Sequence, residues 1–298
     1  GDDEQQQQWP RTGKIEFRNV TLRYRDGLPT VLKRVSFTVA DREKVGVVGR
    51  TGSGKSTLLL ALLRIVEIDD DGAGDILIDG VSTRALGLYK LRRGVAIIPQ
   101  DPVLFTGTVR YNLDPFDEYA DDVLLEAVRR ANLADALGDD GLAHEVTEGG
   151  ENFSVGQRQL LCVARALVRK PKILLMDEAT ASVDLETDQL IQSMVRECFE
   201  QCTVITIAHR LHSVMDSDRV IVMDAGEVAE FDTPYNLLRM GAGDDDERTK
   251  PSGKKRRGKK AAAAAAALGS DGGSERGLLR SLVADTGKTS SRRLMLIA

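Results

Sequence analysis

The sequence predicts an α/β fold in which a parallel sheet follows an antiparallel β subdomain and is interrupted by a helical insertion. Three observations support this prediction: alternating apolar and polar stretches near the N-terminus, unbroken apolar runs further on, and stretches of helical period between those runs. Alternation is typical of strands with one face in solvent, whereas unbroken apolar runs are typical of strands covered on both faces. The two kinds of strand therefore belong to different parts of the fold.

Each element follows from its local pattern. The alternating stretches, predicted to be antiparallel strands, are residues 15–24 and 31–39, and residues 75–80 are predicted to be a further short strand and turn. The apolar runs, predicted to be buried parallel strands, are residues 95–98, 173–176, 203–208 and 220–223. The helical patterns cover residues 122–136, 156–168 and 187–199. Because residues 114–154 are mainly helical and lie between two buried strands, they are predicted to form the insertion.

Composition separates one domain from several polar segments. Residues 1–13 are polar and rich in Gln and are predicted to be a disordered linker, whereas the domain itself is predicted to span residues 15–286. Within it, residues 241–273 combine acidic, basic and alanine runs that cannot bury a core, and are predicted to be a low-complexity insertion before a terminal helix at 275–283. Residues 287–298 form a tail. Because the chain starts in a polar linker, we expect it to be a piece of a longer polypeptide.

The overall composition excludes several classes of protein. The 298 residues are 42% hydrophobic and 29% charged, which is enough apolar material for a full core. The formal net charge of -5 gives no general attraction to nucleic acid, and no apolar run approaches the roughly 20 residues that span a bilayer. The three cysteines form no C-x-x-C pair, so we expect a reducing, cytosolic setting.

Residues 49–56 form a complete G-x-x-x-x-G-K-[ST] motif between a strand-like stretch and a helix-like stretch. That placement is typical of a P-loop and predicts a P-loop NTPase core that binds ATP or GTP. The backbone amides of the loop would surround the β-phosphate, Lys55 would reach the β- and γ-phosphates, and Ser56 would hold Mg²⁺. The expected nucleotide ligands are Gly49, Thr51, Gly52, Ser53, Gly54, Lys55, Ser56 and Thr57.

Two carboxylates, Asp177 and Glu178, follow directly on the apolar run at 173–176. In a P-loop protein an acidic residue at this place holds Mg²⁺ through its water shell, and a second one can orient or deprotonate the attacking water. A simple cap of the strand is the alternative. We therefore predict that Asp177 is a metal-binding residue and that Glu178 is catalytic.

A third motif precedes the helical pattern at 156–168. Ser154 and Gln157 fit the S-x-x-Q capping box that opens a helix. A serine and a glycine at a helix N-terminus, here Ser154 and Gly156, also provide a site for an anion. Both interpretations can hold for the same turn.

With these motifs, nearly all of residues 15–240 resembles the nucleotide-binding domain of ABC transporters. The P-loop corresponds to the Walker A motif, and the run that ends in Asp177 and Glu178 corresponds to Walker B with its glutamate. Residues 153–157, with the sequence Phe-Ser-Val-Gly-Gln, correspond to the signature. The family's Q-loop, D-loop and switch histidine have counterparts in Gln100, residues 182–184 and His209.

Within that family, residues 104–116 and 148–157 are similar to the second, C-terminal cassette of subfamily C, the multidrug-resistance-associated group. Two features depart from the family pattern. Val155 stands in the signature where a glycine is usual, and the low-complexity segment at 241–273 interrupts the C-terminal region.

The resemblance implies roles for single residues. Tyr24 would stack on adenine, Gln100 would contact Mg²⁺ or the lytic water, and His209 would hydrogen-bond the γ-phosphate. Because the family binds ATP between two cassettes arranged head to tail, the signature would contact a γ-phosphate held by a different cassette through Ser154, Gly156 and Gln157. His144 and His212 receive no role.

The function that the resemblance implies is an ATP-binding and ATP-hydrolysing engine of an exporter, with ATP and Mg²⁺ as cofactors. Its partners would be a second ABC cassette and transmembrane domains of the same polypeptide, at the cytosolic face of a membrane, with no nucleic acid. One alternative is a soluble ABC ATPase acting on nucleic acid or ribosomes, supported only by the basic block at 254–260. The other is a non-hydrolysing switch, against which Glu178 argues.

Overall fold

The computed structural model describes residues 9–70, 74–177, 183–208, 210–239 and 277–286, and residue 294. Two predicted catalytic residues, Glu178 and His209, lie outside the described residues. The predicted low-complexity insertion at 241–273 also lies outside them, as does the predicted tail except for Leu294.

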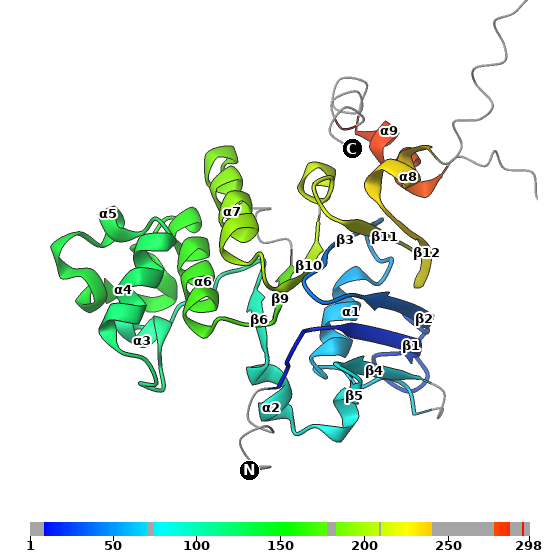
Figure 1. The fold of residues 1–298 in the computed structure, drawn as a ribbon, viewed down its shortest axis with the longest axis horizontal. Helices are drawn as coiled ribbons and strands as arrows, with labels where there is room; N and C mark the ends of the chain where they lie inside the picture. Colours follow the sequence, from blue (N-terminus) through cyan, green and yellow to red (C-terminus); the bar gives the residue numbers. More distant parts are fainter. Residues whose placement is uncertain are drawn as a thin grey trace, which may run out of the picture.

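The N-terminal part of the chain forms a four-stranded antiparallel sheet, as the alternating stretches predict (Figure 1). Its strands are, in spatial order, β2 (Leu32–Val39), β1 (Ile15–Leu22), β4 (Asp75–Ile78) and β5 (Val81–Ser82). Phe17 lies opposite Phe37, and their rings stack with centroids 4.5 Å apart. Both side chains are buried in a core that this sheet shares with helix α1 (Lys55–Leu62).

The second sheet has six strands and is parallel except for the pairing of its last two strands along the chain. In spatial order the strands are β12 (Glu227–Asp232), β11 (Arg219–Asp224), β3 (Lys44–Gly49), β10 (Thr203–Ile207), β9 (Ile173–Asp177) and β6 (Val95–Ile98). Along β9, Ile173 and Leu175 belong to one hydrophobic core, whereas Leu174 and Met176 belong to another. The strand is therefore covered on both faces, which explains its unbroken apolar sequence.

Helices cover both faces of the six-stranded sheet (Figure 1). On one face α1 packs between the two sheets, because its buried residues share a core with strands of both. The helices of the other face and of the insertion are α3 (Val109–Leu113), α4 (Asp121–Arg130), α5 (Ala134–Leu137), α6 (Val155–Arg169) and α7 (Leu185–Cys198). Further short elements are α2 (Leu88–Arg93) and β7 (Gly107–Thr108), which precede α4, and β8 (Glu145–Val146), which precedes α6.

One predicted helix is two helices in the structure. The pattern at 122–136 predicts a single helix, but α4 and α5 are separate. Asn132 between them has a φ of 55°, in the left-handed region that interrupts a helix and that asparagine tolerates. The break is hidden in the sequence because the apolar spacing continues across it, with buried side chains at Ala131, Leu133 and Leu137.

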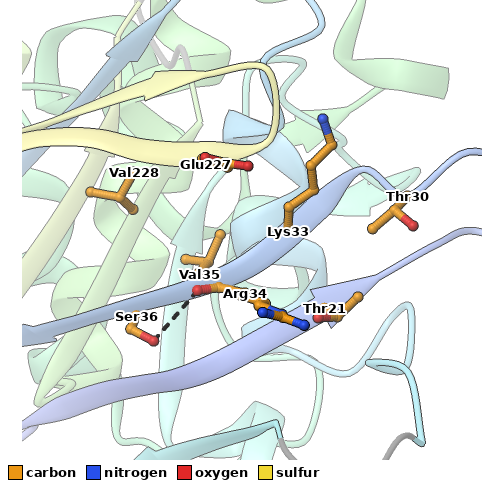
Figure 2. Close-up of a pocket in the computed structure, with 8 residues that line it drawn as sticks. All are labelled: Thr21, Thr30, Lys33, Arg34, Val35, Ser36, Glu227 and Val228. Carbon is orange, nitrogen blue, oxygen red and sulfur yellow. Dashed lines mark hydrogen bonds between the residues drawn. The ribbon is translucent and has the colours of Figure 1, made fainter. Parts of the chain in front are cut away.

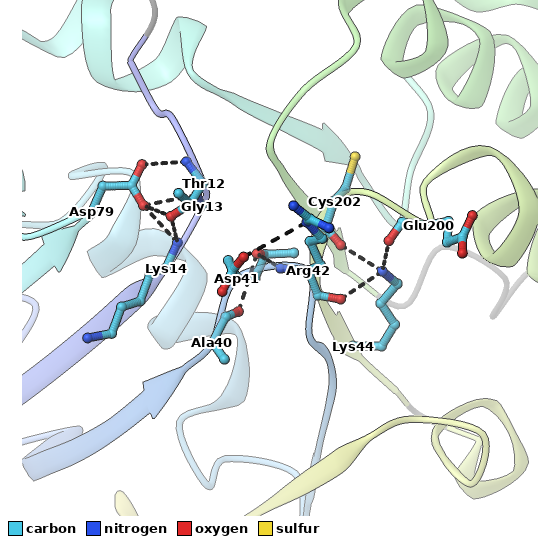
Figure 3. A network of polar contacts seen from close by, with 11 residues as sticks. Thr12, Gly13, Lys14, Ala40, Asp41, Arg42, Lys44, Asp79, Glu200 and Cys202 are labelled. Atoms are coloured by element: carbon cyan, nitrogen blue, oxygen red, sulfur yellow. Dashed lines mark hydrogen bonds and ion pairs between the residues drawn. The ribbon is translucent and has the colours of Figure 1, made fainter.

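The segment at 9–13 differs from the expectation of a disordered linker. The carboxylate of Asp79 accepts hydrogen bonds from four consecutive backbone N–H groups, at 2.7 to 3.0 Å, which belong to Arg11, Thr12, Gly13 and Lys14. Asp79 also accepts the hydroxyl of Thr12 at 2.5 Å (Figure 3). A polar segment is held in place here because one carboxylate, far away in sequence, satisfies a run of amides.

Figure 3 also shows how the strand that leads into the P-loop is fixed at its start. The amine of Lys44, the first residue of β3, donates to three backbone carbonyl oxygens at 2.7 to 2.9 Å, those of Arg42, Glu200 and Cys202. Glu200 and Cys202 follow the C-terminus of α7, where a positive charge is favourable. Burial lowers the pKa of Lys44.

The C-terminal helices α8 (Pro234–Arg239) and α9 (Leu278–Asp285) pack together on a small third core that includes Leu237, Leu279 and Val283. The carboxylate of Glu230 in β12 accepts the first two backbone N–H groups of α9. The terminal helix predicted near 275–283 is thus observed as α9.

Candidate nucleotide-binding site

The carboxyl ends of four parallel strands meet at one edge of the six-stranded sheet. Val47 of β3 lies opposite Ile207 of β10, and Ile207 lies opposite Asp177 of β9, so the three residues form one row. On the far side of β9, Met176 lies opposite Ile98 of β6. The P-loop, Asp177 and the turn that carries Gln100 come directly at or after these strand ends, and the topology therefore brings them to the same edge.

The P-loop is folded around the amine of Lys55. Lys55 Nζ donates to the carbonyl oxygens of Gly49 and Arg50, at 2.9 and 3.1 Å, and the residue is only 9% exposed. Gly54, the residue before α1, has a φ of 100°, which a side chain would disfavour. The loop therefore places the buried amine of Lys55 at the N-terminus of α1.

The loop fits a chain of phosphates. Ser53 Oγ is buried, and among the described residues it has no hydrogen-bond partner. A Cβ built at Gly52 would meet nothing within 4 Å, so the space beside the loop is open. Phosphate oxygens would supply acceptors for the Ser53 hydroxyl and the loop amides, next to the positive end of α1.

The turn between β11 and β12 is hydrogen-bonded to the backbone of the P-loop. Gly226 N–H donates to the carbonyl oxygen of Ser53 at 3.2 Å, and Lys33 N–H donates to the carbonyl oxygen of Gly226 at 2.9 Å. Beside this turn, Lys33 of β2 and Glu227 of β12 line a cavity of about 650 Å³ between the edges of the two sheets (Figure 2). The two sheets thus hold the loop between them.

Tyr24 lies beside the first turn of α1. Its hydroxyl is 3.0 Å from Oγ1 of Thr57, and the residue is 46% exposed. The neighbouring Arg23 is fixed by an ion pair with Asp69 at 2.8 Å. The ring is therefore anchored at one end with its remaining surface partly in solvent. Stacking of Tyr24 on adenine stays a prediction.

The predicted capping box at the start of α6 is confirmed. Ser154 Oγ accepts the backbone N–H of Gln157 at 3.1 Å, and Gln157 Oε1 accepts that of Ser154 at 2.8 Å. Val155, the first residue of α6, is 38% exposed. The side of Gly156 lies against α7, because a Cβ there would be 3.0 Å from Cγ2 of Thr187. Among the described residues, no hydrogen bond links this turn to the P-loop.

The structure brings together three residues to which sequence reasoning gave no role. Asp188 of α7 lies 3.3 Å from Nε2 of His212 and 3.5 Å from the guanidinium of Arg210. A signal was present in the sequence, because Asp188 has helical spacing with the apolar Ile191 and Val195 on the buried face of α7. A charged residue in such a series is unusual unless it has a partner.

Residues 32–181 match the sequence profile of the family described as ABC transporter. The chain belongs to this family. Its relatives include the "ABC transporter C family member 3" of Dictyostelium discoideum, 55% identical over 79% of this chain, and the "ATP-binding cassette sub-family C member 2" of Mus musculus, 53% identical over 77% of it. The chain spans about a sixth of these relatives, 17% and 15% of their respective lengths.

A solved structure gives the same assignment for the fold. A bacterial Atm1-family ABC exporter with ATP bound is 37% identical and superposes with a TM-score of 0.71 over 77% of this chain and 40% of the exporter chain. The predicted resemblance to subfamily C is therefore confirmed, and the chain is an ATPase domain of the ABC family. The comparisons do not support the nucleic-acid alternative. Of the helices that the structure describes, none has the length and hydrophobicity of a membrane-spanning segment.

Proposed function

We propose that the chain hydrolyses ATP in a site that it completes with a second cassette, and that this drives the transmembrane domains of an exporter. The observation that carries the proposal is the separation of two half-sites. The P-loop has the features of a triphosphate cradle, whereas the signature turn at Ser154 and Gly156 packs on α7 in another part of the fold (Figure 1). Each half needs its complement from another cassette.

The residues at the sheet edge divide into binding and hydrolysis roles. Lys55 neutralises phosphate charge, while the exposed Ser56 and Gln100, with Asp177, offer oxygen ligands of the kind that Mg²⁺ prefers. Bound Mg²⁺ supplies charge neutralisation on the β- and γ-phosphates. Glu178 orients and deprotonates the attacking water, and His209 donates to the γ-phosphate. Tyr24 covers the adenine ring.

The signature of this chain suits a weaker site. Val155 places a β-branched side chain, 38% exposed, at the N-terminus of α6, where a glycine would leave the amides accessible. A γ-phosphate brought to this turn by another cassette would be kept at a greater distance. We infer an unequal pair, in which this chain's own P-loop and carboxylates form the active site and its signature serves the less active one.

A groove bordered by α2, α3 and α6 fits a cytosolic segment of the transmembrane domains. It has a volume of about 630 Å³ and is lined by α2, by the segment around α3, and by Arg165 and Arg169 of α6. Three aromatic residues that line the groove are largely exposed to solvent. Their exposed fractions are 70% for Tyr89, 58% for Phe105 and 76% for Phe116. Exposed aromatic side chains beside arginines are typical of an interface that another polypeptide covers. We infer that the polypeptide that covers this groove is a segment of the transmembrane domains of the exporter.

The decisive experiment measures steady-state ATP hydrolysis against protein concentration, with and without a tethered cassette that carries Leu-Ser-Gly-Gly-Gln. We expect the chain alone to bind Mg-ATP and turn over slowly, and the tethered partner to raise the rate at least tenfold. A partner whose signature serine is replaced by arginine is the matched control and should give no rise. A fast rate that depends on neither concentration nor partner would contradict the shared site.

A further inference from the structure

Asp188 is a carboxylate in the interior of the domain. Its side chain is 2% exposed, and its Oδ2 lies 3.5 Å from the guanidinium of Arg210 and 3.3 Å from Nε2 of His212. Its Oδ1 is also buried and has no hydrogen-bond partner within the described part of the chain. Burying a carboxylate with such incomplete pairing is unfavourable, so the residue needs an explanation beyond packing.

Arg210 and His212 belong to the segment that follows β10. On the other side of position 209, Ala208 is fixed, because its N–H donates to the carbonyl oxygen of Val47 in β3 at 3.1 Å. The described residues after β10 are therefore held to β3 at Ala208 and to α7 at Arg210 and His212. The anchor on α7 is Asp188.

The N-terminus of α7 also contacts the signature turn, which is proposed to bind the γ-phosphate of ATP. Asp184 caps the helix, accepting the backbone N–H of Thr187 at 2.9 Å and its hydroxyl at 2.8 Å. Thr187 so held lies against Gly156, since its Oγ1 would be 3.1 Å from a Cβ at that glycine. One turn of α7 thus touches the signature turn through Thr187 and the segment after β10 through Asp188.

We propose that Asp188 is a positioning residue that fixes the segment after β10 by holding Arg210 and His212, and that it links this segment to the signature turn. The inference rests on the proposed function, because it concerns the same ATP site. Within the described residues, the contacts of Asp188 are with this segment and not with the P-loop, so its charge bears on how the segment is held and not on how phosphate is bound. Hydrolysis, and not ATP affinity, therefore depends on the charge of Asp188.

The test compares ATP affinity and hydrolysis in the tethered pair described above. For Asp188→Asn we expect the Kd for ATP to stay within twofold of wild type and hydrolysis to fall at least tenfold. Arg210→Gln should likewise leave the Kd for ATP unchanged and reduce hydrolysis. Because the side chain of Arg210 is 39% exposed, this substitution does not require the interior to repack. Arg210→Lys keeps the positive charge and should restore hydrolysis to within about threefold of wild type. The double variant Asp188→Asn with Arg210→Gln should lose no more than either single variant.

Glu43→Gln is the matched control, because it also removes a buried carboxylate from an ion pair, with Arg219, but at the other end of β3. It should hydrolyse ATP at the wild-type rate. The inference is overturned if Asp188→Asn and Arg210→Gln hydrolyse ATP normally, if they lose affinity and rate together, or if Glu43→Gln shows the same loss. If the wild-type pair itself fails to bind or hydrolyse ATP, the proposed function fails instead.

Discussion

Gln159 in α6 donates its side-chain N–H to the backbone carbonyl oxygen of Pro99, the residue before Gln100, at 2.9 Å. Gln159 is 1% exposed, so this bond ties the signature helix to the turn after β6 from inside the domain. Sixty residues of sequence separate the two groups. A movement of α6 would therefore also move the turn that carries Gln100 at the sheet edge.

Replacing Gln159 by methionine tests the importance of that bond. The substitution keeps the length of the side chain and leaves the Pro99 carbonyl without its donor, so we expect a loss of about 1–2 kcal/mol in the free energy of unfolding. Urea unfolding measures it. Gln189→Met, at an exposed position of α7, is the control and should change stability by less than about 0.5 kcal/mol. Equal effects at both positions would contradict the importance of the bond.

Lys55 and Glu178 are expected to fail in different ways. Lys55→Ala removes charge that the phosphates already meet in the ground state, so nucleotide titration should show loss of tight ATP binding. Glu178→Gln should keep binding and slow hydrolysis by a factor of roughly 10² to 10⁴, the usual effect of a positioned base. Loss of binding to the same extent in both variants would refute the assignment.

Tyr24 provides a prediction about the base. Tyr24→Phe keeps the ring and loses only the contact with Thr57, so its affinity for ATP should change by less than about threefold. Tyr24→Ala removes the stacking surface, which is worth about 1–3 kcal/mol, and should weaken ATP binding between roughly 5-fold and 150-fold. Tyr235→Ala, another exposed tyrosine, controls for loss of a ring elsewhere. Unchanged affinity in Tyr24→Ala would place adenine somewhere else.

Asp79 makes the anchoring of residues 9–14 dependent on pH. Burial alone would raise the pKa of Asp79, but the hydrogen bonds donated by Thr12, Arg11 and Lys14 lower it below its ordinary value. A carboxyl whose pKa is lower in the folded state stabilises that state fully above its unfolded pKa of about 3.9, and the effect is lost as the pH falls through the folded pKa. Release of the segment should therefore begin only below about pH 4.

Trp9, the single tryptophan of the chain, reports this release directly. It packs beside Gly94, where an added Cβ would lie 2.9 Å from the indole ring. Acrylamide should quench its fluorescence weakly between pH 5 and 7 and more strongly below about pH 4. In Asp79→Asn, quenching should be strong at every pH. Equal protection of Trp9 in both proteins at neutral pH would show that Asp79 is not the anchor.

Much of the fold could be predicted from local sequence because the signals are local. The apolar run of β9 indicates a strand covered on both faces, and the P-loop motif places its glycines and Lys55 between a strand and a helix. The capping box of Ser154 and Gln157 is also readable, since its two residues lie three positions apart. The sequence does not reveal the break at Asn132, because buried positions continue on both sides of it.

The sequence by itself therefore determined the family and most strands and helices of the core, and it predicts which residues form the ATP site. Only the tertiary structure decided that Asp79 binds the backbone of residues 11–14, that Gln159 reaches Pro99, and that Asp188 lies beside Arg210 and His212. The physical reason is the same in each case. A carboxylate or amide that is wholly or partly buried takes the partner that the fold brings close to it, and residues separated by 22 to 68 positions carry no mutual pattern in the sequence.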